Sequence, residues 1–319
     1  MMNEMNGGKA EQQMTVVTLF EGDYHLGVGA LVNSLARAGF RGRIVAGFRG
    51  ALPPWTQQLV ALGPDRFRIE GGPEIEFRRL QVGVHFTNYK PDFLLQLLNE
   101  GACPVGVAYF DPDITLCCSW GFVEQWTEEG VALCEDITNG TMPENHPLRR
   151  QWIRVAQASS WGQPKRRLNR YYNAGFVALR KEQRGFLETW REVIQLTEHS
   201  GTKLDVFMPG TREQSFYIPD QDGLNVTCMY SEEPLSTIGP EGMGFVHGGF
   251  TMYHSAGGSK PWRKKFLRSA LAGVPPWNGD KHFLKMAEGP IRIYSPRKLT
   301  QRRLLCALAS LIGRFYRRR

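Results

Sequence analysis

Two carboxylates one residue apart, Asp111 and Asp113, have the type and spacing for metal chemistry. They follow the apolar run Val107-Ala-Tyr-Phe110, which predicts a buried strand that Pro112 would stop. Because side chains two apart share a face in an extended chain, both carboxylates would point the same way beyond the strand. Two hard oxygen donors at the carboxyl end of a strand suit a divalent cation that carries phosphates. Asp-Pro-Asp is also ordinary turn chemistry, so this segment alone leaves a turn and a metal site as alternatives.

A second segment, His254-Ser-Ala-Gly-Gly-Ser-Lys-Pro-Trp262, could complete such a site. An imidazole nitrogen beside two carboxylates suits manganese better than magnesium. Gly257 and Gly258 would let backbone amides approach a phosphate, and Lys260 would add a point charge. A lone histidine in a loop is usually structural, but a histidine, two glycines and a lysine within nine residues favour a binding function.

Side-chain amides and carboxylates gather in two other segments. Asn173 lies in the apolar run 171–179, a predicted strand, and offers both a donor and an acceptor to sugar hydroxyls. Asp220-Gln-Asp-Gly-Leu-Asn225 holds two carboxylates and two amides within six residues. That segment could orient a polyol through Asp220 and Gln221, or it could simply begin a helix capped by Asp220.

The elements that must position these residues follow an α/β order. Residues 15–20 and 43–48 predict strands, and residues 29–36 between them predict a helix. This β-loop-α-β order implies a parallel sheet with covered faces. The loop after the first strand is then a natural edge for a nucleotide, where Asp23 could bond a base or ribose and Tyr24 could stack. A helix-capping role for Asp23 is equally open.

The remaining segments are harder to assign. Residues 1–13 are polar and without an apolar period, and we expect them to be disordered. Residues 116–170 predict long loops with one or two helices, for example at 150–158. Such loops above an active edge would bind the acceptor, or they would form a packed subdomain without chemistry.

Composition sets the broad class. The 42% hydrophobic and 22% charged content is typical of a soluble globular protein, and the net charge of +8 favours an anionic partner. The six cysteines form no CxxC pair, and no secretory apolar run follows Met1, which predicts reduced thiols in the cytoplasm.

Four of these segments, in this order, resemble glycosyltransferase family 8, which includes glycogenin and bacterial lipopolysaccharide galactosyl- and glucosyltransferases. They are Phe110-Asp-Pro-Asp113, Asn173-Ala-Gly-Phe176, Asp220 to Asn225, and His254-x-x-Gly-x-x-Lys-Pro-Trp262. The resemblance implies a GT-A fold, with a Rossmann-like, mixed and mostly parallel sheet between helices. It also implies a nucleotide-sugar donor (usually UDP-linked), Mn²⁺ or Mg²⁺, and transfer with retention to a glycan or lipid-linked acceptor of the cell envelope.

The resemblance also assigns roles to residues. The D-x-D carboxylates Asp111 and Asp113 would hold the metal with His254. The diphosphate would lie on Gly257, Gly258 and Lys260, and the nucleoside on Phe20, Asp23 and Tyr24. The donor sugar would contact Asn173, Asp220 and Gln221. Gln221 matches the group discussed in the family as lying beneath the anomeric carbon, although an amide is a poor nucleophile and a front-face displacement is at least as plausible.

The carboxyl end, residues 298–319, predicts a basic amphipathic helix beyond a catalytic domain at 14–297. Its apolar residues fall within roughly 120° of a helical wheel, with arginines off that face: Leu304, Leu305, Leu308, Leu311, Ile312 and Phe315, against Arg302, Arg303, Arg314, Arg317 and Arg318. The run is too short to span a bilayer. It predicts an interfacial helix drawn to anionic lipid at the inner face of the cell membrane, or a terminal helix packed on the domain.

Two other functions remain as alternatives. A basic nucleic-acid-binding protein would explain the charge, but the excess is concentrated at the tail and no nucleic-acid motif is present, so we expect no nucleic-acid partner. A catalytically inactive GT-A scaffold would not require Asp111, Asp113, His254 and Lys260 to be intact.

Overall fold

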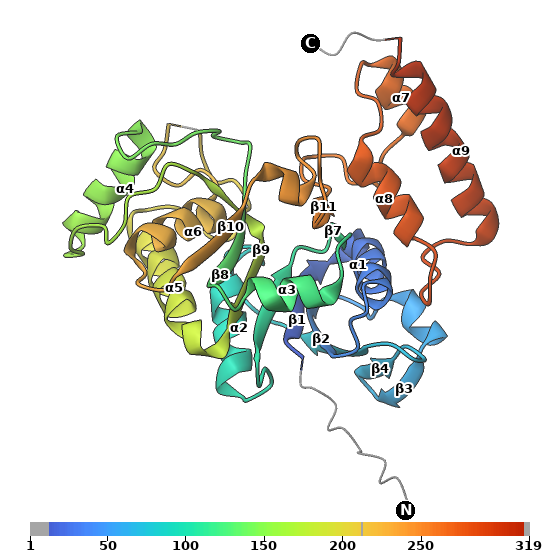
Figure 1. Ribbon diagram of the computed structural model, residues 1–319, viewed down its shortest axis with the longest axis horizontal. Helices are drawn as coiled ribbons and strands as arrows, with labels where there is room; N and C mark the ends of the chain where they lie inside the picture. The colour runs from blue at the N-terminus through green and yellow to red at the C-terminus, as the bar shows by residue number, and fades with distance from the viewer. Residues whose placement is uncertain (1–12, 212, 316–319) are drawn as a thin grey trace, which may run out of the picture.

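The computed structural model describes residues 13–211 and 213–315, so the predicted disordered segment 1–13 lies, apart from Gln13, outside the described residues. A nine-stranded sheet forms its centre (Figure 1). Its strands are β1 (Thr15–Glu21), β2 (Arg43–Arg49), β3 (Val60–Gly63), β4 (Arg66–Arg68), β5 (Glu74–Arg79), β6 (Gly106–Phe110), β8 (Val131–Glu135), β9 (Tyr172–Arg180) and β10 (Leu235–Ile238). Strands β7 (Ile114–Leu116) and β11 (Met252–His254) form a separate two-stranded sheet.

Helices fill the connections. The α-helices are α1 (His25–Arg37), α2 (Lys90–Asn99), α3 (Trp120–Trp126), α4 (Pro147–Ala158), α5 (Arg184–His199), α6 (Pro219–Tyr230), α7 (Phe266–Leu271), α8 (Asn278–Met286) and α9 (Pro296–Ile312). Short 3₁₀ helices lie at η1 (Gly22–Tyr24), η2 (Pro54–Gln58), η3 (Lys181–Gln183) and η4 (Pro240–Met243). None of the described helices is long and apolar enough to cross a bilayer.

The sheet has the order β10-β8-β9-β6-β1-β2-β5-β4-β3. Strands β6, β1, β2 and β5 run parallel, as the β-loop-α-β order predicts. Strand β9 enters antiparallel between β6 and β8, and β3 and β4 form an antiparallel edge beyond β5. The sheet is therefore mixed around a parallel centre, which confirms the predicted fold class.

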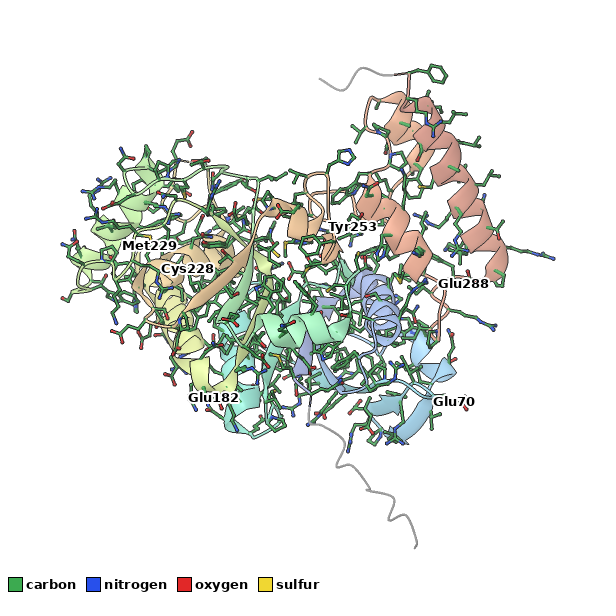
Figure 2. The ribbon with its side chains drawn as sticks, in the orientation of Figure 1. Glu70, Glu182, Cys228, Met229, Tyr253 and Glu288 are labelled. Carbon is green, nitrogen blue, oxygen red and sulfur yellow. The ribbon has the colours of Figure 1, made fainter. Side chains whose placement is uncertain are left out.

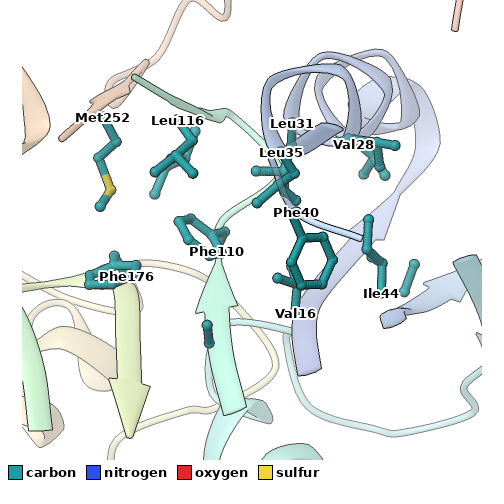
Figure 3. Packing of buried hydrophobic residues seen from close by; sticks show 14 of the residues in the cluster. Val16, Val28, Leu31, Leu35, Phe40, Ile44, Phe110, Leu116, Phe176 and Met252 are labelled. Carbon is teal, nitrogen blue, oxygen red and sulfur yellow. The ribbon is translucent and has the colours of Figure 1, made fainter. Parts of the chain in front are cut away.

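Each face of the sheet carries its own apolar core. On one face, α1 packs through side chains such as Leu31 and Leu35 (Figure 3). Trp120 of α3 belongs to the same core. On the other, α2, α5 and α6 bury side chains such as Phe93 and Trp190. Strands buried on both faces need continuous apolar sequence, and this is why β1, β6 and β9 were recognisable as apolar runs.

The segment 116–170 differs from the expectation of mainly loop structure. It contains α3 and then β8, which is an internal strand of the sheet between β9 and β10. The long irregular connections in this segment are residues 136–146 and 159–170, on either side of α4. The apolar run 131–135 is as short as many buried strands, and the aromatic and basic residues around it concealed its periodicity.

Helices α7, α8 and α9 form a separate layer, here called the C-terminal helical unit, on the α1 side of the molecule (Figure 1). The segment that connects α8 to α9 is bound to the buried Asn33 of α1. The Asn33 amide group donates to the carbonyls of Met286 and Ile291, and its oxygen accepts from the Ile291 N–H. In Figure 2, Tyr253 of β11 lies at the base of this unit, and its ring is 5.1 Å from that of His282 on α8.

Candidate active site

The Asp111-Pro-Asp113 segment connects two strands of different sheets. Strand β6 ends at Phe110, as Pro112 predicts, and β7 begins at Ile114. The Ile114 N–H donates to the Asp111 carbonyl, and the Asp111 N–H donates to the carbonyl of Gly175 on β9. The segment is thus a turn rather than extended chain, and its two carboxylates still converge. The sequence left a turn and a metal site as alternatives. The structure has a turn here, and the same turn brings together side chains that could bind a metal.

His254 reaches this turn through a small second sheet. Strand β11 pairs antiparallel with β7 and places His254 opposite Ile114, and the Ser255 N–H donates to the Asp113 carbonyl. As a result, His254 Nε2 lies 3.3 Å from Asp113 Oδ1 and 3.7 Å from Asp111 Oδ2. Asp113 and His254 are buried, while Asp111 is partly exposed. Residues 140 positions apart therefore present three ligand atoms within 4.8 Å of one another.

The Lys260 ammonium lies against this cluster. Its Nζ is 2.6 Å from Asp113 Oδ2 and also bonds the Ser255 carbonyl. Burial would raise the pKa of Asp113, but the charges of Lys260 and His254 outweigh burial and hold that pKa below its usual range. Burial likewise lowers the pKa of Lys260, and the carboxylate of Asp113 more than restores it. The pair therefore remains charged.

A second buried cation, Lys90 at the start of α2, was missed by sequence reasoning. Its Nζ lies 2.9 Å from Asp220 Oδ2, 3.1 Å from Asp111 Oδ1 and 2.9 Å from the Ala174 carbonyl. Although burial lowers its pKa, the two carboxylates raise it overall. A lysine in the first turn of a helix usually faces water, so the sequence carried no sign that this one is only 1% exposed.

The donor-sugar candidates Asn173, Asp220 and Gln221 lie together on the β9 and α6 side. The Ala174 N–H of β9 donates to Gln221 Oε1 of α6, so this hydrogen bond connects α6 to β9. Asp220 has one oxygen on Lys90, whereas its buried Oδ1 has no hydrogen-bond partner among the described residues. Buried polar atoms are rarely left unpaired, so this oxygen indicates a place where a ligand could bond.

Asn173 is held by a second acid that the sequence did not point out. Its amide donates to Asp136 Oδ2 at 2.5 Å, and its Oδ1 accepts from the Gly175 N–H. Asp136 follows β8 and is buried. The orientation of the Asn173 amide is therefore set by groups on both sides.

Asp222 and Asn225, in the same motif, serve the fold. The Asp222 carboxylate accepts from the Ile218 N–H and the Tyr171 hydroxyl, and burial raises its pKa to about 7. Asn225 exchanges hydrogen bonds with the backbone of Tyr172. The capping interpretation thus fits Asp222 rather than Asp220.

Gly175 is needed for the cluster to close. A β-carbon at this position would lie 2.5 Å from His254 Cε1 and 2.9 Å from Asp111 Oδ2, both far inside van der Waals contact. Gly175 lies inside strand β9, and the groups that approach its backbone are the His254 ring and the Asp111 carboxylate.

The loop that follows β1, which contains Asp23 and Tyr24, lies beside the segment 254–263. Asp23 accepts from Arg263, whose guanidinium lies 5.2 Å from the Tyr24 ring, and the same ring meets Trp262 edge-on. Phe20, by contrast, is buried in the core and stacks on Phe48. Its side chain is therefore not available to a nucleoside, as expected for an inward position on a strand covered by a helix.

The glycines of the 254–262 segment line an open stretch of backbone. Gly257 has φ +98°, a conformation that disfavours other residues, and a β-carbon at either Gly257 or Gly258 would meet nothing within 4 Å. Both N–H groups precede Lys260 by only a few residues, so a phosphate near the lysine could also meet backbone donors.

The residues present fit a divalent cation. Two carboxylates and one imidazole converge, and both carboxylates need positive charge nearby. His254 Nε2, the nitrogen that faces the carboxylates, is a common ligand atom for such ions. Lys90 pairs with Asp111 through Oδ1, and Lys260 pairs with Asp113 through Oδ2.

Comparisons with known proteins give the fold its context. No protein-family model matches this chain, and no curated protein matches it. Among solved structures, the bifunctional glycosyltransferase WbbM in its apo form aligns with a TM-score of 0.56 and 16% identity over 94% of this chain. This chain spans only about half of WbbM, 53% of its length.

The galactosyltransferase LgtC, in complex with donor and acceptor sugar analogs, aligns with a TM-score of 0.51 and 16% identity, covering 91% of this chain and 100% of LgtC. An active-site glutamine-to-glutamate mutant of LgtC aligns with the same TM-score, at 14% identity and with the same coverage. At such identities the likeness establishes the architecture. The chain has the fold of GT-A glycosyltransferases.

Proposed function

We propose that this chain is a metal-dependent, retaining glycosyltransferase similar to family 8, which moves a sugar from a nucleotide-sugar donor to a glycan or lipid-linked acceptor. One observation carries the proposal: Asp111, Asp113 and His254 converge at the carboxyl end of β6, with Lys260 against them, in a GT-A fold. Ligands of open α/β sheets bind at this edge. The proposed catalytic domain is 14–297, with acceptor contacts from segment 116–170.

Each side chain has a role in this scheme. Asp111, Asp113 and His254 would hold Mn²⁺ or Mg²⁺, which when bound would neutralise the charge that develops on the departing diphosphate. Lys260 lies beside the triad and would bind the same diphosphate together with the backbone of Gly257 and Gly258. The lysine would exchange part of its contact with Asp113 for the phosphate oxygens.

The sugar would lie between the triad and α6. The free Oδ1 of Asp220 and the amide of Gln221 are the polar groups available there, with Asn173 held in place by Asp136. LgtC has an active-site glutamine, and Gln221 is the corresponding candidate in this chain. Because an amide is a weak nucleophile, we favour retention by a front-face displacement.

The nucleoside would lie on the first loop. Tyr24 is only partly buried and could stack on a base, and Asp23 could accept from the base or ribose after releasing Arg263. LgtC was crystallised with donor and acceptor sugar analogs, which supports a donor of the same chemical class. A uridine diphosphate sugar is the donor we propose.

Helix α9 would bring the enzyme to an anionic membrane surface at the inner face of the cell membrane. Four apolar residues of the predicted helix 298–319 are exposed by 44% to 82%, namely Leu304, Leu308 and Leu311 on α9 and Phe315 beyond its end. Among the described residues the helix ends at Ile312. Leu305 and Ile312, from the same predicted face, pack on α7 and α8 instead. Arg317 and Arg318 lie outside the described residues.

Thermal unfolding with a panel of nucleotide sugars, with and without Mn²⁺, tests this function. We expect one UDP-sugar with Mn²⁺ to raise the melting temperature of the wild type and of Asp65→Asn, an exposed acid remote in sequence from the site. Asp113→Asn should lose the shift and reduce transfer by ~10²–10³-fold, as removal of one charge-stabilising group commonly does. An unchanged shift in Asp113→Asn would overturn the assignment.

A further inference from the structure

A groove of about 470 Å³ runs between α8 and α9, in the C-terminal helical unit and away from the metal-ligand triad. Lys281 and Lys285 line it from α8, and Arg303 and Arg314 line it from α9 and its end. Its floor includes the apolar side chains of Leu284 and Ala307. No acidic residue lines the groove.

The cations of this groove are unlike those of the active site. Arg303 pairs with Glu288 at 2.8 Å, and Glu288 does not line the groove. Lys281, Lys285 and Arg314 have no acidic partner within 4.0 Å among the residues that the structure describes. Like charges that converge without a counter-charge repel one another, so an external anion would relieve a cost already present in the fold.

The apolar surface beside the groove narrows the choice of anion. Arg303 and Ala307 line the groove, and Leu304 and Leu308 each follow one residue later, about 100° around the helix. Both leucines are exposed, as is Leu311 one turn on. A soluble anion would use only the charges, whereas a lipid would use the charges and the leucines together.

We propose that this groove is a binding site for the phosphate group of an anionic lipid, with the acyl chains lying along Leu304, Leu308 and Leu311. The inference rests on the proposed membrane association of α9 and is independent of glycosyl transfer. Lysine and arginine close to a lipid surface bind such phosphates, and the groove is large enough for one headgroup. The site would give the enzyme a fixed orientation, because Arg302 ties α9 to the Pro261 carbonyl beside Lys260.

Titration calorimetry with dihexanoyl-phosphatidylglycerol and with inorganic phosphate tests the site, alongside flotation with vesicles of phosphatidylglycerol or of phosphatidylcholine alone. The test variant is Lys285→Ala/Arg314→Ala. The control, Arg150→Ala/Arg154→Ala, removes the same number of exposed charges from α4 at the opposite end of the molecule (Figure 1). We expect saturable binding of the short-chain lipid, about 30-fold weaker in the test variant since each cation near the lipid contributes about one kcal/mol, and unchanged in the control.

Three results would overturn the proposal: no saturable lipid binding, an equal loss in both variants, or phosphate binding as tightly as lipid. The last would assign the groove to a soluble phosphate. Lys285→Gln alone provides the same comparison if the double variant unfolds. Mn²⁺-dependent stabilisation by a UDP-sugar, measured on the same samples, should persist in the test variant, so that a failure of the donor site and a failure of the groove are distinguished.

Discussion

The positive charges of the candidate active site, at the edge of the sheet beyond β6, are paired with carboxylates. Most of those in the C-terminal helical unit that line the groove are not. At the edge, the ammonium groups of Lys90, which is buried, and Lys260, which is half-buried, lie within 3.1 Å of carboxylates. In the groove between α8 and α9, Lys281, Lys285 and Arg314 have no acidic partner within 4.0 Å among the described residues. A buried charge must be paired inside the protein to exist there, whereas an exposed one can remain available to a partner. The edge is therefore preorganised, and the groove depends on a ligand to balance its charge.

The largest effect that would test this contrast is the loss of Lys90. We expect Lys90→Met to lower the free energy of unfolding by about 3–5 kcal/mol, because the buried Asp220 and the partly exposed Asp111 would lose the cation that they share. Lys281→Met in the groove should change it by less than about 0.5 kcal/mol. Urea unfolding measures both. Asp220→Asn added to Lys90→Met should recover part of the loss, and equal effects of the two lysines would refute the contrast.

Gly175→Ala would break the geometry of the edge without changing its charge. The new methyl would overlap His254 and Asp111, so we expect Mn²⁺ affinity to fall by roughly 10–100-fold, as for other changes that disturb ligand orientation. Gly121→Ala in α3 is the matched control, because a β-carbon there meets nothing within 4 Å. Calorimetric titration with Mn²⁺ compares the two, and equal affinities would contradict the metal assignment.

Leu308→Glu tests the proposed lipid-binding surface of α9. The substitution places a carboxylate on the exposed apolar strip of α9, where we expect binding to phosphatidylglycerol vesicles to weaken about tenfold through lost apolar burial. The folded protein should be little changed. Val60→Glu on β3, another exposed apolar position, is the control, and flotation that falls equally in both would show that α9 has no special part.

The smallest expected effect concerns His282 of α8, in the C-terminal helical unit. Its ring forms a hydrogen bond with the hydroxyl of Thr115 on β7, the strand that follows Asp113. Burial, aided by Lys285 and Arg37, lowers its pKa from 6.5 to about 4. The folded state then binds fewer protons than the unfolded state, so stability is lost as the pH falls from 6.5 towards 4. His282→Gln should reduce the difference in unfolding free energy between pH 7 and pH 5, measured in urea, and an unchanged difference would contradict this account of His282.

Sequence reasoning succeeded at the active edge where the signal was local. Asp111 and Asp113 are neighbours in the chain, and their pairing with His254 required only the order of motifs, not their distance. Lys90 and Asp136 were missed because nothing in their own segments indicates burial. Phe20 was misjudged for the converse reason, since a residue at the end of a strand can face either the ligand or the core.

The sequence by itself determined the elements that local periodicity and breakers encode. These include β1, α1 and β2 with their parallel order, and the end of β6 before Pro112. Only the tertiary structure decided where β9 enters the sheet, because an antiparallel insertion depends on partners far along the chain. It likewise divided the apolar face of α9, with Leu305 and Ile312 packed and Leu304 and Leu308 exposed. A helical wheel shows which residues share a face, but the neighbouring helices determine how much of that face is buried.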